Sequence, residues 1–355
     1  MLTLPDHFRV LLKHIEPKGE RAEAAKNIPA QVRDFLQKSE DISTVDPHSR
    51  LAGSYARCTA ISDIKDVDII LLIAPEYKEQ DPGDVIQTLF KALHGLPEAL
   101  GETGEVAAIR RRQRRSVNVH LEESDFDLDV VPAIALDGLD EPLDIPDKDW
   151  SRWVKTHPLG YAERLSELNG DHGGKVVRLV KLLKQWRDIH MIYKRPKSYW
   201  LECMVYCRIA DGTVSTDGLS YAELFRDLLG SIYDDFLPYL NRSEAVPKIK
   251  DPMLGNNVAH NWERNAFESF MRRVEKSYRW AERALEQDSE SEAVQLWQNV
   301  FGDRFPDDVE QEKAKSLRDA VLTGNIFVTS TGKVVTEKPR ERHVQSPPQR
   351  FYSED

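Results

Sequence analysis

The spacing of apolar and polar positions changes along the chain, and each change predicts a different kind of structure. Residues 1–45 carry apolar side chains at the three- and four-residue spacing of helices. Between residues 51 and 135 the pattern becomes β-like after a Gly-Ser turn, with an apolar strand at Val67–Ile73. The other elements predicted there are a helix around Asp84–Leu93 and strands at Ser116–Leu121 and Phe126–Val131. This segment is therefore predicted to be a mixed α/β unit, braced by the helices that precede it.

From about residue 160 the helical period returns and dominates the chain to about residue 306. The clearest predicted helices are Lys175–Arg187, Tyr221–Leu229, Asn265–Leu285 and Ser291–Phe301. Large apolar residues become scarce after Phe327, so most of the end of the chain is expected to be mobile. Its exception is Ile326–Val335, where β-formers flank a turn and predict a small hairpin docked on the body.

The pattern as a whole predicts an α+β protein in three parts. Residues 1–160 are expected to form the mixed α/β core with its N-terminal helical brace. Residues 161–306 are expected to form a helical domain. Residues 307–355 are expected to form a largely flexible tail.

Composition and charge narrow the classes of function. The chain has 355 residues, with 49 Lys and Arg against 60 Asp and Glu, and a formal net charge of −11. An extended nucleic-acid surface needs a surplus of basic side chains, so we expect none, and any nucleotide site should be local. The longest apolar run, Val67–Ala74, contains Asp68 and is far shorter than the roughly 20 residues that span a membrane. The first residues lack the apolar segment of a secretory signal, so a cytoplasmic protein is expected.

The candidate chemistry begins in the segment Leu51-Ala-Gly-Ser-Tyr-Ala-Arg-Cys-Thr59. Gly53 has no side chain, so a triphosphate can approach the backbone there, and Ser54 adds a hydroxyl and an amide near a predicted helix start. In the strand that follows, Asp66 and Asp68 are two residues apart and therefore project from the same face. Two carboxylates on one face are suited to binding Mg²⁺.

A third carboxylate lies about sixty residues further on, in Phe126-Asp-Leu-Asp-Val-Val-Pro-Ala133. Asp129 falls in an apolar strand, where a carboxylate is costly unless a cation or hydrogen bonds compensate it. Two Mg²⁺ ions, for which Mn²⁺ is an expected substitute, would share Asp66 and Asp68 at about 3.5–4 Å from each other. Asp129 would then hold the ion that activates an attacking sugar hydroxyl. Asp127 faces the same side and is the rival for that role.

A Gly-Ser pair, an Asp-x-Asp at a strand start and a distant Asp before Val-Val-Pro-Ala resemble the nucleotidyltransferase superfamily of DNA polymerase β. The wider chain resembles the bacterial cyclic-oligonucleotide synthases of anti-phage signalling, the CD-NTases, which are relatives of animal cyclic GMP-AMP synthase and oligoadenylate synthetase. The segments that carry this resemblance are Lys181-Leu-Leu-Lys-Gln-Trp186, Lys197-Ser-Tyr-Trp-Leu-Glu202, Asp251-Pro, Asn256-Asn-Val258 and Leu296-Trp-x-x-x-Phe-Gly302. Two departures are Cys58, where relatives often have Gly, and the absence of the zinc insertion of the animal DNA sensor.

The resemblance implies a polymerase β-like core followed by a helical domain of the oligoadenylate-synthetase type. It implies that Lys184 and Ser198 contact the phosphates of the donor, that Tyr199 stacks on a base, and that Lys181 is a neighbouring candidate. The substrates would be ATP and other NTPs, joined with release of pyrophosphate into a cyclic di- or trinucleotide messenger for anti-phage defence. Regulatory or effector proteins, encoded nearby, would be partners, with the C-terminal tail as one point of contact.

Physical reasoning partly supports phosphate binding by the helical domain. The basic residues Lys175, Arg178, Lys181 and Lys184 recur every three residues and predict a basic stripe, which would hold a triphosphate or form an ordinary solvated helix face. The run Arg110-Arg-Arg-Gln-Arg-Arg115 is interpreted as the rim of the nucleotide cleft, where one arginine meets phosphate or all are solvated. Two other functions remain open at this point. One is an RNA- or protein-modifying nucleotidyltransferase, of the CCA-adding or AMP-transferring kind, and the other is a catalytically silent scaffold.

Overall fold

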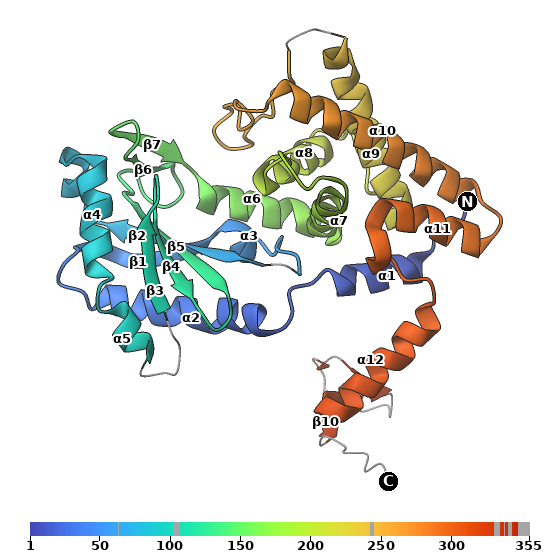
Figure 1. Ribbon diagram of the computed structural model, residues 1–355, viewed down its shortest axis with the longest axis horizontal. Coiled ribbons are helices and arrows are strands. Elements are labelled where there is room, and N and C mark those ends of the chain that lie inside the picture. The colour runs from blue at the N-terminus through green and yellow to red at the C-terminus, as the bar shows by residue number, and fades with distance from the viewer. Residues whose placement is uncertain are drawn as a thin grey trace.

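The computed structural model describes residues 1–62, 64–101, 107–241, 245–329, 334–336, 338–339 and 343–346. Figure 1 shows two halves side by side and a C-terminal extension that projects from them. We call these the sheet half, built on the central sheet, and the helical half. Within the described residues, no helix combines the length and the apolar character needed to cross a membrane.

The sheet half contains a five-stranded mixed sheet. Its strands are β1 (Thr44–Ala52), β2 (Asp66–Ile73), β3 (Ala107–Arg112), β4 (Val117–Leu121) and β5 (Phe126–Ala133). They lie in the order β1-β2-β5-β4-β3, with β2 parallel to β5 and the other neighbours antiparallel. The three predicted strands are confirmed as β2, β4 and β5, whereas β1 and β3 were not predicted because their polar residues hide the alternation.

Alternate residues of β2 serve two hydrophobic cores, which explains its nearly unbroken apolar run. Val67, Ile69 and Leu71 face a core shared with the helices α2 (Glu20–Gln37), α4 (Pro82–Ala92) and α5 (Leu96–Gly101). Ile70 and Leu72 face a smaller core shared with the two-stranded ribbon of β6 (Leu143–Asp147) and β7 (Arg152–Thr156). The second face is also the face of Asp66 and Asp68, because side chains alternate along a strand.

The helical half packs around one large core. Its helices after the sheet are α6 (Pro158–Asp171), α7 (Lys175–His190), α8 (Ser198–Ala210), α9 (Tyr221–Leu240), α10 (Arg264–Glu286) and α11 (Glu290–Phe301). The α+β class and the four predicted helices are confirmed; α10 and α11 match the prediction to within one residue at each end, whereas α7 and α9 continue three and eleven residues beyond it.

The first helix, α1 (Pro5–His14), packs in the helical half rather than against the sheet that it precedes. Phe8 is fully buried and meets Trp297, Phe301 and Phe305 edge to face, at ring-centre distances of 4.9, 5.8 and 5.3 Å. The helix α2 does brace the sheet, as expected. The chain therefore starts in one half and crosses to the other before residue 20, which local periodicity does not reveal.

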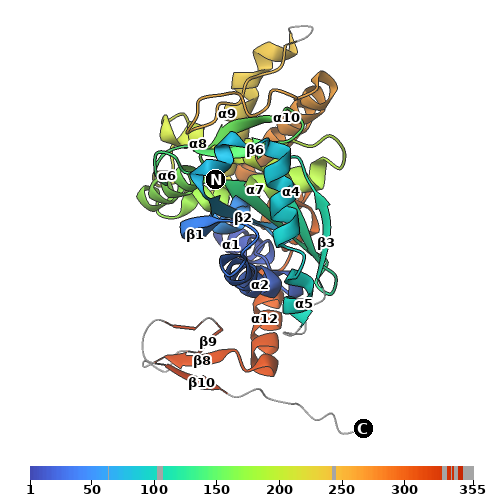
Figure 2. The ribbon, with the colours of Figure 1, turned by 90° about the vertical axis from the view of Figure 1, so that its left-hand side faces the viewer.

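The C-terminal extension contains more regular structure than its composition predicts. Residues Val309–Thr323 form the helix α12, and β8 (Ile326–Thr329) lies between β9 (Val334–Val335) and β10 (His343–Ser346). The predicted hairpin is present, because β8 pairs antiparallel with β9. It lies beyond α12 and away from the two halves, so the expectation that it docks on the body was wrong (Figure 2). The sequence of α12 is rich in strong helix formers, but its apolar residues are few and mostly small and form only a weak stripe, which is why the pattern missed it.

Replacing Phe8 with Ala tests whether α1 belongs to the helical core. We expect Phe8→Ala to lower the free energy of unfolding by about 3 kcal/mol, because it removes a fully buried ring from an aromatic cluster. Urea unfolding followed by tryptophan fluorescence measures the effect. Phe35→Ala, which removes a partly buried ring from α2, is the matched control and should cost less. An unchanged urea midpoint for Phe8→Ala would show that α1 does not stabilise this half.

Candidate active site

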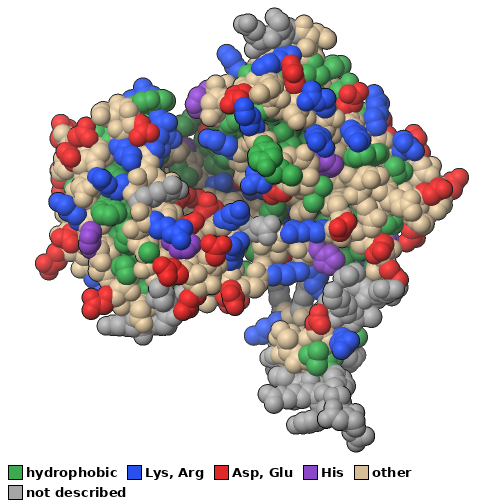
Figure 3. Space-filling view, viewed as in Figure 1, with side chains coloured by type: hydrophobic (Ala, Val, Ile, Leu, Met, Phe, Trp, Pro, Cys, Tyr) green, Lys and Arg blue, Asp and Glu red, His purple; other side chains and the backbone are tan. Residues whose placement is uncertain are grey.

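Four carboxylates meet on two adjacent parallel strands. The register of β2 with β5 places Asp66 beside Asp127 and Asp68 beside Asp129. Within each strand the two acids are two residues apart, and the register places each acid of β2 beside an acid of β5. All four side chains therefore project from one face of the sheet. Figure 3 shows the surface hollowed between the two halves. The structure thus brings together the three acids that the sequence singled out, together with the rival Asp127.

The acids of β2 have raised pKa values. Burial, followed by the charges of Asp66 and Asp129, raises the pKa of Asp68 to about 7, and Arg57 opposes this rise. Burial and then the charge of Asp127 raise the pKa of Asp66. A cluster of carboxylates that repel one another is an environment that a divalent cation stabilises.

The donor set suits Mg²⁺, which prefers carboxylate oxygens. Within the described part of the chain, however, no group of three His, Cys, Asp or Glu side chains is gathered closely enough to hold an ion. Instead, Asp68 lies against Gly53, and Asp129 accepts hydrogen bonds from two amide side chains. The carboxylates are therefore close enough to interact electrostatically, and side-chain rotation would be needed for them to share a cation.

Gly53 makes room for Asp68. A Cβ atom at position 53 would lie 1.9 Å from Oδ2 of Asp68, and the residue has a φ of +71°, which side chains disfavour. Ser54 follows it in the short helix α3 (Gly53–Ala56), and its carbonyl accepts the backbone N–H groups of Thr59 and Ala60. Cys58 has a φ of +55°, a left-handed backbone conformation that favours Gly.

A buried ionic network connects this loop to the helical half. Glu202 of α8 is fully buried, and its carboxylate accepts hydrogen bonds from Lys184 at 2.8 Å and from Arg57 at 2.8 Å. The ammonium of Lys184 also donates to the carbonyl and hydroxyl oxygens of Thr59, at 2.9 and 3.1 Å. Burial would raise the pKa of Glu202, but the charges of Lys184 and Arg57 lower it to about 2.

This network was not predicted from the sequence. Glu202 was noted only as part of a motif and Arg57 only as part of the segment Leu51–Thr59, whereas Lys184 was predicted as a contact of the donor phosphates rather than as a partner of Glu202. Arg57 and Glu202 are 145 residues apart, so no local pattern pairs them. The available signal was one acidic residue inside an apolar helix, at a position where an unpaired charge is too costly to bury.

The predicted basic stripe on α7 does not form a single phosphate-facing or solvated surface. Lys175 donates to backbone carbonyls of Thr216 and Leu219, and Arg178 donates to the hydroxyl of Tyr221. Lys181 is buried and donates to both carboxylate oxygens of Glu16, while Lys184 belongs to the network above. All four cations therefore have protein partners on different elements.

The remaining predicted residues begin α8. The hydroxyl of Ser198 accepts a hydrogen bond from Arg187 at 3.0 Å. The hydroxyl of Tyr199 donates to Asp251 at 3.1 Å, and its ring is partly buried. The guanidinium of Arg57 lies 5.7 Å from the centre of that ring, which places Tyr199 at the junction between the loop of Gly53 and the helical half.

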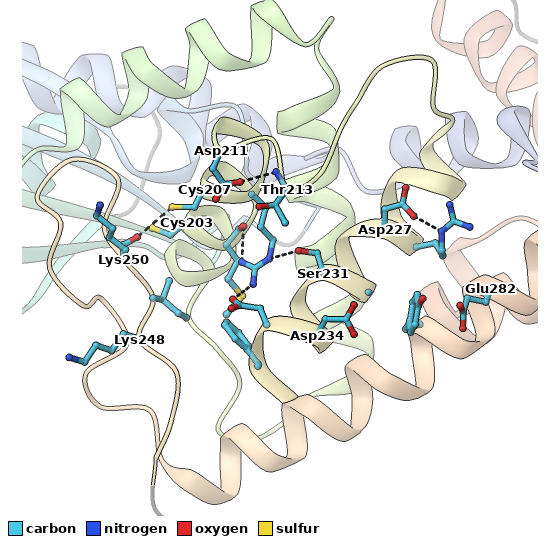
Figure 4. A pocket seen from close by; sticks show the side chains of 18 residues that line it. Cys203, Cys207, Asp211, Thr213, Asp227, Ser231, Asp234, Lys248, Lys250 and Glu282 are labelled. Carbon is cyan, nitrogen blue, oxygen red and sulfur yellow. Dashed lines mark hydrogen bonds and ion pairs between the residues drawn. The ribbon is translucent and has the colours of Figure 1, made fainter. Parts of the chain in front are cut away.

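A cavity in the helical half is separate from the site of the carboxylates. It has a volume of about 730 Å³ and lies in the helical half between α8, α9 and α10 (Figure 4). The side chain of Arg208 lines this cavity and forms an ion pair with Asp235 at 2.8 Å. Both acidic and basic side chains line the cavity, and none of the four carboxylates of β2 and β5 does. The carboxylates of β2 and β5 and this cavity are therefore two separate features of the molecule.

The buried network makes a testable prediction about stability. We expect Glu202→Gln to lower the free energy of unfolding by about 3–5 kcal/mol, because it leaves Lys184 and Arg57 buried without a counter-ion. Thermal melting monitored by circular dichroism provides the measurement. The control, Glu263→Gln, breaks an exposed ion pair with Lys194 and should change the melting temperature little. Equal melting temperatures for the two variants would contradict the role assigned to Glu202.

The raised pKa of Asp68 predicts a pH-dependent gain in stability for Asp68→Asn. The unfolded side chain loses its proton near pH 3.8 and the folded one near pH 7, so the wild type loses stability as the pH rises through this window. Asn remains neutral, so metal-free Asp68→Asn should be more stable than the wild type by about 4 kcal/mol at pH 8. The difference should vanish near pH 4. Urea unfolding in EDTA at both pH values measures it, and a variant less stable than the wild type at pH 8 would contradict the prediction.

Comparisons with known proteins identify relatives of this chain. The family model of the Second Messenger Oligonucleotide or Dinucleotide Synthetase domain matches residues 2–169. A cyclic AMP-AMP-AMP synthase from an Acinetobacter species is 33% identical over 346 residues, which cover 95% of this chain and 94% of the relative.

Two solved structures have a similar fold. One is CdnC of E. coli in a complex with a HORMA protein, with a TM-score of 0.66, 18% identity, and coverage of 86% of this chain and 99% of that one. The other is the DncV cyclic AMP-GMP synthase of Vibrio cholerae with a linear intermediate, with a TM-score of 0.63, 15% identity, and coverage of 87% and 99%.

The fold and the full-length relative agree with the family that the motifs predicted. They support a cyclic synthase over an RNA- or protein-modifying transferase and over a silent scaffold. The chain belongs to the bacterial CD-NTase family and is a nucleotidyltransferase that synthesises a cyclic oligonucleotide second messenger.

Proposed function

We propose that the chain condenses three ATP molecules into cyclic AMP-AMP-AMP, as a messenger in defence against phage. The observation that carries this proposal is the match to a synthase of that product over 95% of the chain, which includes both halves and the C-terminal extension. Both halves matter for the choice of nucleotide, because the candidate site lies between them.

The carboxylates of β2 and β5 are the proposed chemical centre. Two Mg²⁺ ions, when bound there, would activate a sugar hydroxyl and stabilise the charge that develops on the α-phosphate and on the departing pyrophosphate. Asp66 and Asp68 would hold both ions, and Asp129 would serve the ion of the attacking hydroxyl. Its place beside Asp68, the acid with the most strongly raised pKa, favours Asp129 over Asp127 for this role. Gly53 keeps the backbone beside Asp68 open, so that phosphate groups can approach both.

In the helical half, Tyr199 is the proposed base-stacking residue, and Ser198 is the proposed phosphate contact at the start of α8. Lys184 and Lys181 already neutralise Glu202 and Glu16. Contact of either lysine with a triphosphate would require an exchange of these partners. We therefore assign Lys184 first to holding the loop of Gly53 and Ser54 through Thr59, and second to the phosphates.

Partner proteins are also part of the proposal. The CdnC structure contains a HORMA protein, and regulation by a protein of this kind is consistent with the anti-phage role. The helix α12 and the small sheet that follows it project from the two halves and offer a surface for such contacts (Figure 2).

The proposal is tested by incubating the purified protein with α-³²P-labelled ATP and Mg²⁺ or Mn²⁺, with no acceptor added. We expect a phosphatase-resistant product with the mass of a cyclic triadenylate, and no requirement for GTP, CTP or UTP. A dinucleotide, or a product that forms only with a second NTP, would contradict the proposed product.

Charge-neutral variants test the metal assignment in the same assay. Asp66→Asn and Asp68→Asn should each lower kcat by about 10³-fold or more, since each removes a ligand that both ions share. Asp129→Asn should also be inactive but should still bind ATP. Asp125→Asn, a change in an exposed acid on the turn before β5, should keep wild-type activity. An active Asp129→Asn together with an inactive Asp127→Asn would reverse the assignment of those two residues.

A further inference from the structure

Asp129 is held by two amide side chains from one hairpin. The amide nitrogen of Gln113 donates to Oδ1 of Asp129 at 2.8 Å, and that of Asn118 donates to the same oxygen at 2.9 Å. Two donors on one oxygen fix the rotation of the carboxylate, so the direction of its second oxygen is set as well.

The two donors reach Asp129 from different parts of the hairpin. Asn118 lies directly opposite Asp129 in the antiparallel register of β4 with β5, and it is buried. Gln113 lies in the turn between β3 and β4, where its backbone N–H donates to the carbonyl of Ser116 at 2.8 Å. The same register places His120 opposite Asp127, with a contact of 3.0 Å between Nδ1 and Oδ1. The strand β4 thus provides a polar partner for each acid of β5.

The arginines beside Gln113 fix the position of this turn. Arg114 and Arg115 donate to the two carboxylate oxygens of Asp147, at 2.7 and 2.9 Å. The Asp147 side chain is fully buried, so it is a rigid point of attachment at the end of β6. Burial would raise the pKa of Asp147, but hydrogen bonds from Arg114 and Arg115 lower it, which keeps the anchor ionised. The backbone N–H of Lys148 also donates to the carbonyl of Arg114 at 3.1 Å.

We propose that Gln113 and Asn118 are positioning residues that orient Asp129 for cation binding, and that Arg114 and Arg115 anchor the turn that presents Gln113. This inference deepens the proposed function, since it rests on the role of Asp129 as a metal ligand. It also gives the arginine run a function other than contact with phosphate, because two of its members are committed to Asp147. The polar partners of a metal-binding carboxylate typically change metal affinity or activity by 10–100-fold when they are removed.

The test uses Gln113→Leu in the full-length protein, because Leu removes the amide from a half-buried position without adding charge. Binding of Mn²⁺ is measured by electron paramagnetic resonance in the presence of a non-hydrolysable ATP analogue. We expect the weaker of two Mn²⁺ sites to lose about tenfold in affinity and the tighter site to be unchanged. In steady-state assays kcat should fall by about tenfold, while KM for ATP stays within twofold. Asn118→Leu should change the same quantities in the same direction.

The matched control is Gln87→Leu, which removes an amide of α4 that accepts a hydrogen bond from Arg112 of the same hairpin. It should leave both Mn²⁺ affinities and kcat unchanged. The proposal is overturned if Gln113→Leu keeps both affinities and kcat within twofold at an unchanged melting temperature. It is equally overturned if Gln113→Leu and Gln113→Ala both lose the two Mn²⁺ sites together with the melting transition, because Gln113 would then be structural. If the wild type makes no cyclic product, the proposed function fails, and the Mn²⁺ titration still decides the role of Gln113.

Discussion

The parallel pairing of β2 with β5 is the constraint on which the candidate site depends. Parallel neighbours place residues of the same parity side by side, so the Asp-x-Asp of β2 and the Asp-x-Asp of β5 form two adjacent rows. A shift of one residue in this register would turn one pair of acids into the core. The apolar residues between and beyond the acids prevent such a shift, because each strand is buried on both faces toward its carboxyl end.

This concentration of charge is costly, and a buried network of opposite charges reduces the cost. Arg57 lies close enough to Asp68 to oppose the rise in its pKa, and it is itself neutralised by Glu202. The same Glu202 binds Lys184, which holds the loop through Thr59. One buried carboxylate of the helical half therefore fixes the cation that faces the acids of the sheet half. A change at Glu202 would affect both the geometry of the loop and the electrostatics of Asp68.

The sequence predicted the elements that carry a local pattern, and it missed those that depend on distant contacts. The acids of β2 and β5 could be predicted because a carboxylate in an apolar strand is costly unless it is compensated, and an acid within an apolar run is visible in the local sequence. The position of α1 in the helical half depends on Trp297 and Phe301, nearly three hundred residues away, so its own periodicity fits either half equally well. The basic residues of α7 lie on one helix at the predicted spacing, but their side chains do not form one surface. Their partners come from α8, α9 and the loops that contain Glu16, Thr59 and Thr216, which no spacing within α7 could supply.

The run of arginines is the clearest case in which composition and geometry lead to different functions. Five arginines in six positions suggest contact with an anion from outside the protein, and the −11 net charge alone makes a broad nucleic-acid surface implausible. Arg114 and Arg115 instead meet the buried anion Asp147. Two side chains of one turn neutralise this fixed anion at a lower entropic cost than a mobile ion would, because folding has already brought the two side chains together. The uncharged residue inside the run, Gln113, is the one that reaches Asp129. An arginine in its place would form an ion pair with that carboxylate and, under the proposed function, would compete with the cation.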